Sequence, residues 1–168
     1  HKLSDSLLTG FFCLILFSLV FFYSVPPLRF KSKPLLDLIS HGLFGGALIF
    51  LLPLVIFEIT LTGFHYWLAF SFFYFSIILE LRNHLDDYES DKKVDLKTTV
   101  CVLGHEKSER LLRYLAIFYP FTILPAFLSV SPRYILLFLV LTFVFLAPFL
   151  LCRSLRSTKG YCLLDAYL

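Results

Sequence analysis

Long runs of apolar residues, separated by short polar segments, dominate the sequence. Five of these runs are long enough to cross the hydrocarbon core of a bilayer, which takes about 20 residues in a helix. A helix satisfies its own backbone hydrogen bonds, so the pattern predicts membrane-spanning helices. The predicted spans are residues 7–25, 38–57, 66–81, 111–130 and 134–152.

The predicted fold class is therefore all-α: a single polytopic membrane helix bundle over residues 1–168, with about five transmembrane helices. Small residues in the second run would let a neighbouring helix approach closely. These residues are Gly42, Gly45, Gly46 and Ala47.

Composition supports this assignment. Hydrophobic residues make up 58% of the chain and charged residues 16%, and the mean hydropathy is +0.82. Soluble domains have about 45–50% apolar and about 25% charged residues. The sequence therefore excludes a solvated globular domain and a disordered tail. The net charge of +3 is too small to imply nucleic acid as a partner.

Positive charges fall almost entirely on one side of the five predicted spans. Of the 15 Lys and Arg residues, only Lys2 and Arg133 lie on the other side. The positive-inside rule assigns the side rich in Lys and Arg to the cytoplasm. We therefore expect an integral membrane protein with two cytoplasmic polar segments, a basic loop at residues 26–37 and an Asp-rich loop at residues 82–110.

The Asp-rich loop contains Asn83, Asp87 and Asp91 at intervals of four residues. On a helix that continues beyond the third span, these side chains lie on one face. Carboxylate and amide oxygens suit Mg²⁺, which often binds one or two carboxylates together with substrate phosphates. The alternative is a solvated loop of balanced charge beside the membrane.

In the basic loop, Pro26 and Pro27 are expected to end the first helix and hold the chain extended. Arg29 and Lys31 would then point the same way, and both can bind phosphate oxygens. The alternative is a simple positive-inside anchor. Since both loops are expected on one membrane face, the two together favour a site for a lipid diphosphate.

Both loops resemble motifs of the UbiA-type intramembrane prenyltransferases. The Asp-rich loop is similar to the second aspartate motif of that family, and the basic loop to its Y-S-x-P-P-x-R-x-K segment. The matching residues are Asn83, Asp87, Asp91, Thr98, Leu103 and Gly104 in the first, and Tyr23, Ser24, Pro26, Pro27, Arg29 and Lys31 in the second. Two departures are His84, where the family often has Asp, and Asp95, where it usually has Gly.

The resemblance implies a fold of roughly nine helices and an Mg²⁺-dependent polyprenyl transferase that uses a prenyl diphosphate and a lipophilic acceptor. Asp87 and Asp91, helped by Asn83, would bind Mg²⁺. Arg29 and Lys31 would contact the diphosphate, with Lys31 also catalytic, and Tyr23 would lie near the reacting end.

The first aspartate motif of the family is not in this sequence. The resemblance therefore implies that this chain is the C-terminal portion of a longer enzyme and that the missing N-terminal helices complete the site. A degenerate relative that binds lipid or acts as a membrane scaffold is the alternative. A CDP-alcohol phosphotransferase is disfavoured, because its D-G-x-x-A-R block is not in the sequence.

Overall fold

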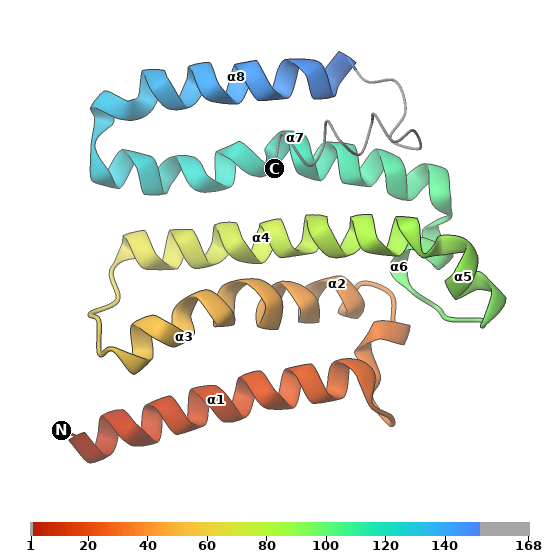
Figure 1. Ribbon diagram of the computed structural model, residues 1–168, viewed down its shortest axis with the longest axis horizontal. Coiled ribbons are helices and arrows are strands. Elements are labelled where there is room, and N and C mark those ends of the chain that lie inside the picture. Colours follow the sequence, from red (N-terminus) through yellow and green to blue (C-terminus); the bar gives the residue numbers. More distant parts are fainter. Residues whose placement is uncertain (1, 152–168) are drawn as a thin grey trace.

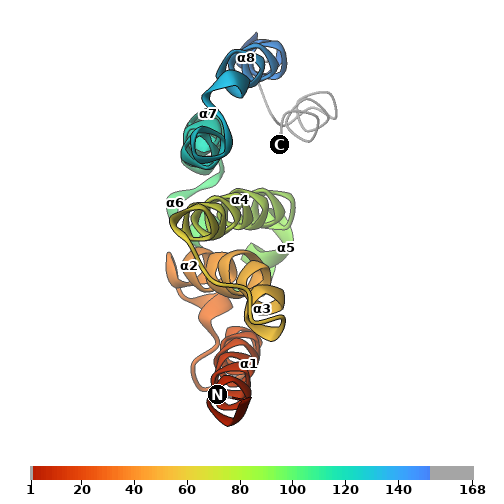
Figure 2. The same ribbon diagram turned by 90° about the vertical axis from the view of Figure 1, so that its left-hand side faces the viewer.

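The computed structural model describes residues 2–151, and within that range every regular element is a helix. The long helices lie side by side in chain order and form a single layer (Figures 1 and 2). The elements are α1 (Lys2–Ser24), η1 (Phe30–Ser32), α2 (Leu36–His41), η2 (Gly42–Ala47), α3 (Leu48–Ile56), α4 (Gly63–Asp86), α5 (Tyr88–Lys93), α6 (Thr99–Leu103), α7 (His105–Val130), η3 (Pro132–Tyr134) and α8 (Ile135–Leu151).

All five predicted apolar runs form helices. Three helices, at Leu36–Ile56, Gly63–Asp86 and His105–Ser129, are long and apolar enough to cross a membrane. Two shorter apolar helices cover Thr9–Ser24 and Ile135–Val144. The chain is thus all-helical over the described residues with three candidate spans. The last residue of the fifth predicted run and the basic residues after it lie outside the described range.

The second span is one continuous helix with a π-helical turn, η2, between α2 and α3. The expected close approach of a neighbouring helix occurs at this turn. A Cβ atom on Gly46 would lie 2.4 Å from the carbonyl oxygen of Phe72 in α4, and one on Gly42 would lie 2.8 Å from the Phe73 ring. Only a residue without a side chain fits at Gly46, so the predicted close helix contact is confirmed at Gly42 and Gly46.

The buried apolar core joins α2, α4, α6 and α7. Its members are Leu38, Ile78, Leu81, Leu85, Val100, Leu112 and Ala116. These residues lie near the end of the layer at which α4 leads into α5 and α6 (Figure 1). The buried core therefore lies at the end of the layer that carries the two polar segments.

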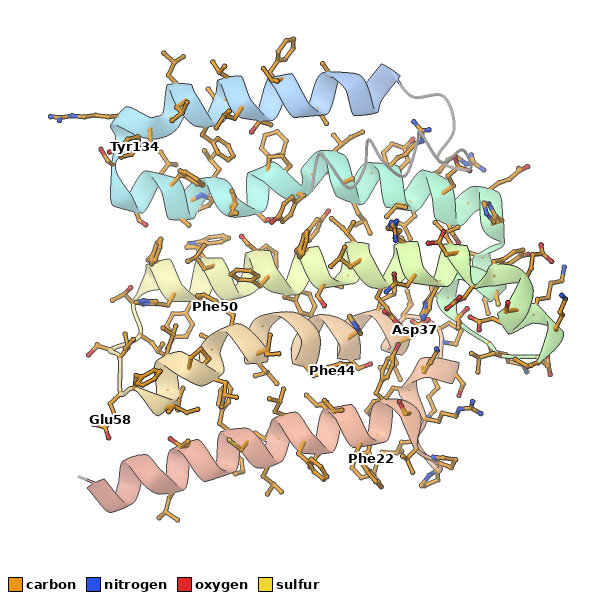
Figure 3. The ribbon with its side chains drawn as sticks, in the orientation of Figure 1. Phe22, Asp37, Phe44, Phe50, Glu58 and Tyr134 are labelled. Atoms are coloured by element: carbon orange, nitrogen blue, oxygen red, sulfur yellow. The ribbon has the colours of Figure 1, made fainter. Side chains whose placement is uncertain are left out.

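Both polar segments leave the layer at this same end, and the links after α3 and after α7 lie at the opposite end (Figure 1). Glu58 marks that opposite end in Figure 3. The segments themselves differ from the expected loops. Helix α4 continues to Asp86 and α7 already begins at His105, because the polar residues there extend the helical hydrogen bonding past the apolar run.

The prediction of an extended chain after the first helix is wrong. Residues 26–28 form a turn with a cis bond between Pro26 and Pro27, and the Arg29 N–H donates to the Val25 carbonyl at 3.1 Å. Arg29 has a φ of 35°, and the 3₁₀ helix η1 follows. A 3₁₀ helix has three residues per turn, so Arg29 and Lys31 do not share a side as they would on a strand.

Candidate functional site

A polar pocket of about 300 Å³ lies at the end of the layer that carries both polar segments. Its lining residues are Lys31, Glu80, Asn83, His84, Asp86 and Asp87. Lys31 comes from η1, and the other five come from the last turns of α4 and from Asp87, which directly follows it. The structure thus brings one predicted residue of the basic segment together with two of the Asp-rich segment.

The Asp-rich segment keeps a helical hydrogen-bond register although α4 ends at Asp86. The Asp87 N–H donates to the Asn83 carbonyl, and the Asp91 N–H donates to the Asp87 carbonyl, both at 2.9 Å. The side chains differ in their surroundings, however. Asn83 and Asp87 are exposed and line the pocket, whereas Asp91 is 8% exposed and lies outside the pocket lining. The Asp91 Oδ2 atom is buried without a hydrogen-bond partner.

Two predicted residues of the basic segment do not line the pocket. Arg29 is exposed in the turn that precedes η1. Tyr23 is buried at the end of α1, where its ring packs edge-on against Phe44, with ring centroids 5.1 Å apart. The Tyr23 hydroxyl donates to Oε1 of Glu80. Tyr23 therefore reaches the pocket only through a residue that lines it.

Glu80 is the centre of a polar cluster. It is not among the site residues predicted from the sequence. Four groups converge on its carboxylate: the Tyr23 hydroxyl, His84 Nε2 at 3.0 Å, His41 Nε2 at 3.4 Å and Asn83 Nδ2 at 3.5 Å. His41 Nδ1 in turn lies 2.9 Å from the Ser76 hydroxyl. We call these five residues (Tyr23, His41, Glu80, Asn83 and His84) the Glu80 cluster.

Asp37 is a second buried carboxylate, fully shielded from solvent near the start of α2. It accepts hydrogen bonds from the Thr99 N–H at 2.6 Å, from the Leu38 N–H at 2.8 Å and from the Thr99 hydroxyl. His84 Nδ1 lies 3.5 Å from its Oδ2 atom. Figure 3 shows Asp37 close to the end of α4 that carries the pocket. His84 therefore lies between two carboxylates, a place where a third carboxylate would be repelled.

A signal for these residues was present in the sequence. An ionisable residue at the end of an apolar span is costly to bury, so it is a candidate for function by default. Glu80 stands at the end of the apolar run of the third span and four residues before His84, which places both on one helix face. Nothing local indicates that Asp37, 43 residues earlier than Glu80, joins them.

Other acidic residues of the segment have different partners. Asp86 faces Arg82 of the same helix at 3.4 Å. Across the part of the chain that the structure describes, no group of three or more His, Cys, Asp or Glu side chains is placed to hold a metal ion.

Residues 3–161 match the sequence model of the UbiA prenyltransferase family. Comparison with curated proteins found no match, and comparison with solved structures found none either. The matched range includes every residue of the pocket, of the Glu80 cluster and of the two polar segments.

Proposed function

This chain belongs to the UbiA prenyltransferase family, and from that premise we propose that it carries the part of a membrane enzyme that binds a polyprenyl diphosphate. Family membership indicates a prenyltransferase-type function in general. The proposed reaction moves the polyprenyl group from its diphosphate to a lipophilic acceptor. The observation that carries the proposal is the pocket in which Lys31 meets Asn83 and Asp87.

The lining of the pocket suits a diphosphate head group. Lys31 offers a compact positive charge to phosphate oxygens. It makes no ion pair with the described residues, so its charge is available to a ligand. Arg29, exposed two residues earlier, would add a second cation at the mouth of the site.

Two oxygen donors of the Asp-rich segment, Asn83 and Asp87, line the same pocket, and we propose that this segment binds Mg²⁺. Asn83, Asp87 and Asp91 would hold it, because their oxygens are the hard ligands that this ion prefers. The buried Asp91 Oδ2 atom without a hydrogen-bond partner is consistent with such a role. Bound Mg²⁺ would offset the negative charge that builds up on the departing diphosphate. We further propose that helices outside this chain supply the remaining ligands.

The reaction breaks the bond between the allylic carbon and the diphosphate oxygen, and the electron pair leaves with the diphosphate. A nucleophilic atom of the acceptor forms a new bond to that carbon and loses a proton. Lys31 and Arg29 stabilise the leaving group, because a positive charge close to a developing negative charge lowers the barrier. The apolar faces of the helices would keep the prenyl chain out of water.

Sidedness is part of the proposal. The excess of Lys and Arg at the pocket end favours the cytoplasmic side for this end of the layer. A prenyl diphosphate would then enter from the cytoplasm with its head group at the pocket.

The test is Asp87→Asn in the full-length protein that contains this chain, with Glu89→Gln as the matched control. Asp87 lines the pocket, whereas Glu89 is an exposed carboxylate of α5 outside the pocket lining. We expect Asp87→Asn to lower Mg²⁺-dependent transfer from a polyprenyl diphosphate by about 100-fold or more, because removal of a ligand's charge weakens the ion's hold. Glu89→Gln should retain activity.

Equal activities of the two variants would remove Asp87 from the site. If the protein is instead a degenerate relative that only binds lipid, the same assay gives a different result. Such a relative would bind the prenyl diphosphate but release no diphosphate with any acceptor.

A further inference from the structure

The segment that carries Lys31 has no buried residue from position 24 to position 36. Its internal hydrogen bonds are local: the Ser32 N–H donates to the Arg29 carbonyl and the Lys33 N–H to the Phe30 carbonyl, both at 2.9 Å. Local turns of this kind fix the shape of a segment but not its place in the molecule. The position of Lys31 in the pocket must therefore depend on how the two ends of the segment are attached.

The first attachment is Tyr23, immediately before the segment. Its ring is buried against Phe44 and its hydroxyl donates to Glu80 of α4. This bond ties residues 57 positions apart in the sequence. It fixes the beginning of the segment to the helix that also carries Asn83.

The second attachment is Thr99, at the beginning of α6. Its hydroxyl accepts a hydrogen bond from the Leu35 N–H at 2.7 Å and donates one to Asp37. A hydroxyl can do both at once, because it has one hydrogen and two lone pairs. The Thr99 N–H gives Asp37 a further bond at 2.6 Å. Both Thr99 and Asp37 are buried, so the bonds between them are shielded from water, whereas the bond from the Leu35 N–H is partly buried.

His84 lies between the two attachments. One ring nitrogen lies 3.0 Å from Glu80 and the other 3.5 Å from Asp37. The segment with Lys31 is thus tied at its first end to α4, which also carries Asn83 and leads directly into Asp87, and at its second end to α6 through Thr99.

We propose that Thr99 and Asp37 are positioning residues that set the place of Lys31 relative to Asn83 and Asp87. Neither lines the pocket, so they act through the backbone at residues 35–37. The consequence for catalysis rests on the proposed function, whereas the attachment itself does not.

The test uses three variants of the full-length protein. Thr99→Val removes the hydroxyl and keeps the shape and the N–H bond to Asp37, whereas Thr99→Ser keeps the hydroxyl. Thr122→Val is the matched control. Thr122 is also a buried threonine, but its hydroxyl donates only within its own helix, to the Tyr119 carbonyl at 2.7 Å.

Amide hydrogen exchange of residues 25–37 is the first measurement. We expect Thr99→Val to speed exchange in this segment by about 10-fold, since it loses one buried and one partly buried hydrogen bond at one attachment. Thr99→Ser and Thr122→Val should change exchange in this segment by less than about twofold. The same rate in Thr99→Val as in Thr99→Ser, or equal acceleration in Thr122→Val, would overturn the proposal.

Binding of inorganic diphosphate in the presence of Mg²⁺ is the second measurement. Thr99→Val should weaken it by about 10-fold, and in an active enzyme it should raise KM for the prenyl diphosphate more than it lowers kcat. Thr99→Ser should restore both. Faster exchange with unchanged diphosphate binding would overturn the positioning role. A wild-type protein without any prenyl transfer would instead refute the proposed function and leave the exchange result valid.

Discussion

At the scale of single residues, the surroundings of two positions account for the residues found there. His84 and Asp95 both depart from the family pattern. His84 lies within 3.5 Å of the Asp37 carboxylate and 3.0 Å of the Glu80 carboxylate, where an acidic side chain would be repelled. Asp95 has a φ of 52°, in the left-handed region that glycine enters freely and that aspartate tolerates better than most residues. The backbone at position 95 therefore favours a residue that tolerates positive φ, such as glycine or aspartate.

This explanation of Asp95 can be tested by stability. Asp95→Gly should leave the free energy of unfolding unchanged or higher, whereas Asp95→Val should lower it by about 1 kcal/mol or more, because a β-branched residue is strained at positive φ. Thermal unfolding in detergent micelles measures both variants. Lys97→Val, an exposed position of the same loop without positive φ, is the control and should be close to wild type. A stable Asp95→Val protein would contradict the explanation.

At the scale of elements, the contact between the second span and α4 decides how near the two polar segments can come. The π-helical turn η2 places Gly42 and Gly46 against Phe72 and Phe73. His41, directly before this turn, then lies within 3.4 Å of Glu80. Extra hydrogen-bonded turns of this type are rare and frequently occur at functional sites.

Substitution of one glycine tests this contact. Gly46→Ala should destabilise the protein by about 2 kcal/mol, because the new methyl group would meet the backbone of α4, which cannot move aside. Gly10→Ala in α1 is the matched control, since a Cβ there meets nothing within 4 Å. It should keep or slightly raise the stability, as alanine favours helix. Equal unfolding temperatures of the two variants would show that α4 does not pack this closely.

At the scale of the whole molecule, the candidate site lies at one end of the helix layer. Both polar segments lie at one end of the layer, and the link that contains Glu58 lies at the other (Figures 1 and 3). Residues of these two segments and of the end of α4 line the pocket. In a membrane protein, the two ends would face opposite aqueous compartments. The charge distribution then predicts which compartment receives the pocket.

Cysteine labelling in intact cells measures this orientation. With the native cysteines replaced, a cysteine at Glu58 should react with a membrane-impermeant maleimide from outside. One at Lys93, an exposed residue of α5 at the pocket end, should react only after the membrane is opened. Labelling of both positions from the same side would contradict a membrane-spanning layer, and the reverse pattern would contradict the proposed cytoplasmic pocket.

The sequence by itself determined the elements and the family. Apolar runs form helices because each helix satisfies its backbone locally, and the small residues of the second span fit only a close helix contact. The spacing of Asn83, Asp87 and Asp91 also fixed their common register, because the hydrogen bonds that set it span only four residues.

Tertiary structure alone decided which of these residues meet. Lys31 rather than Arg29 reaches the pocket, since the turn after α1 and the 3₁₀ helix replaced the expected extended chain. The bonds from Tyr23 to Glu80 and from Thr99 to Asp37 join residues 57 and 62 positions apart. Such pairs leave no trace in local periodicity. They form only because the packed helices bring distant buried polar groups within hydrogen-bond distance, where each must find a partner.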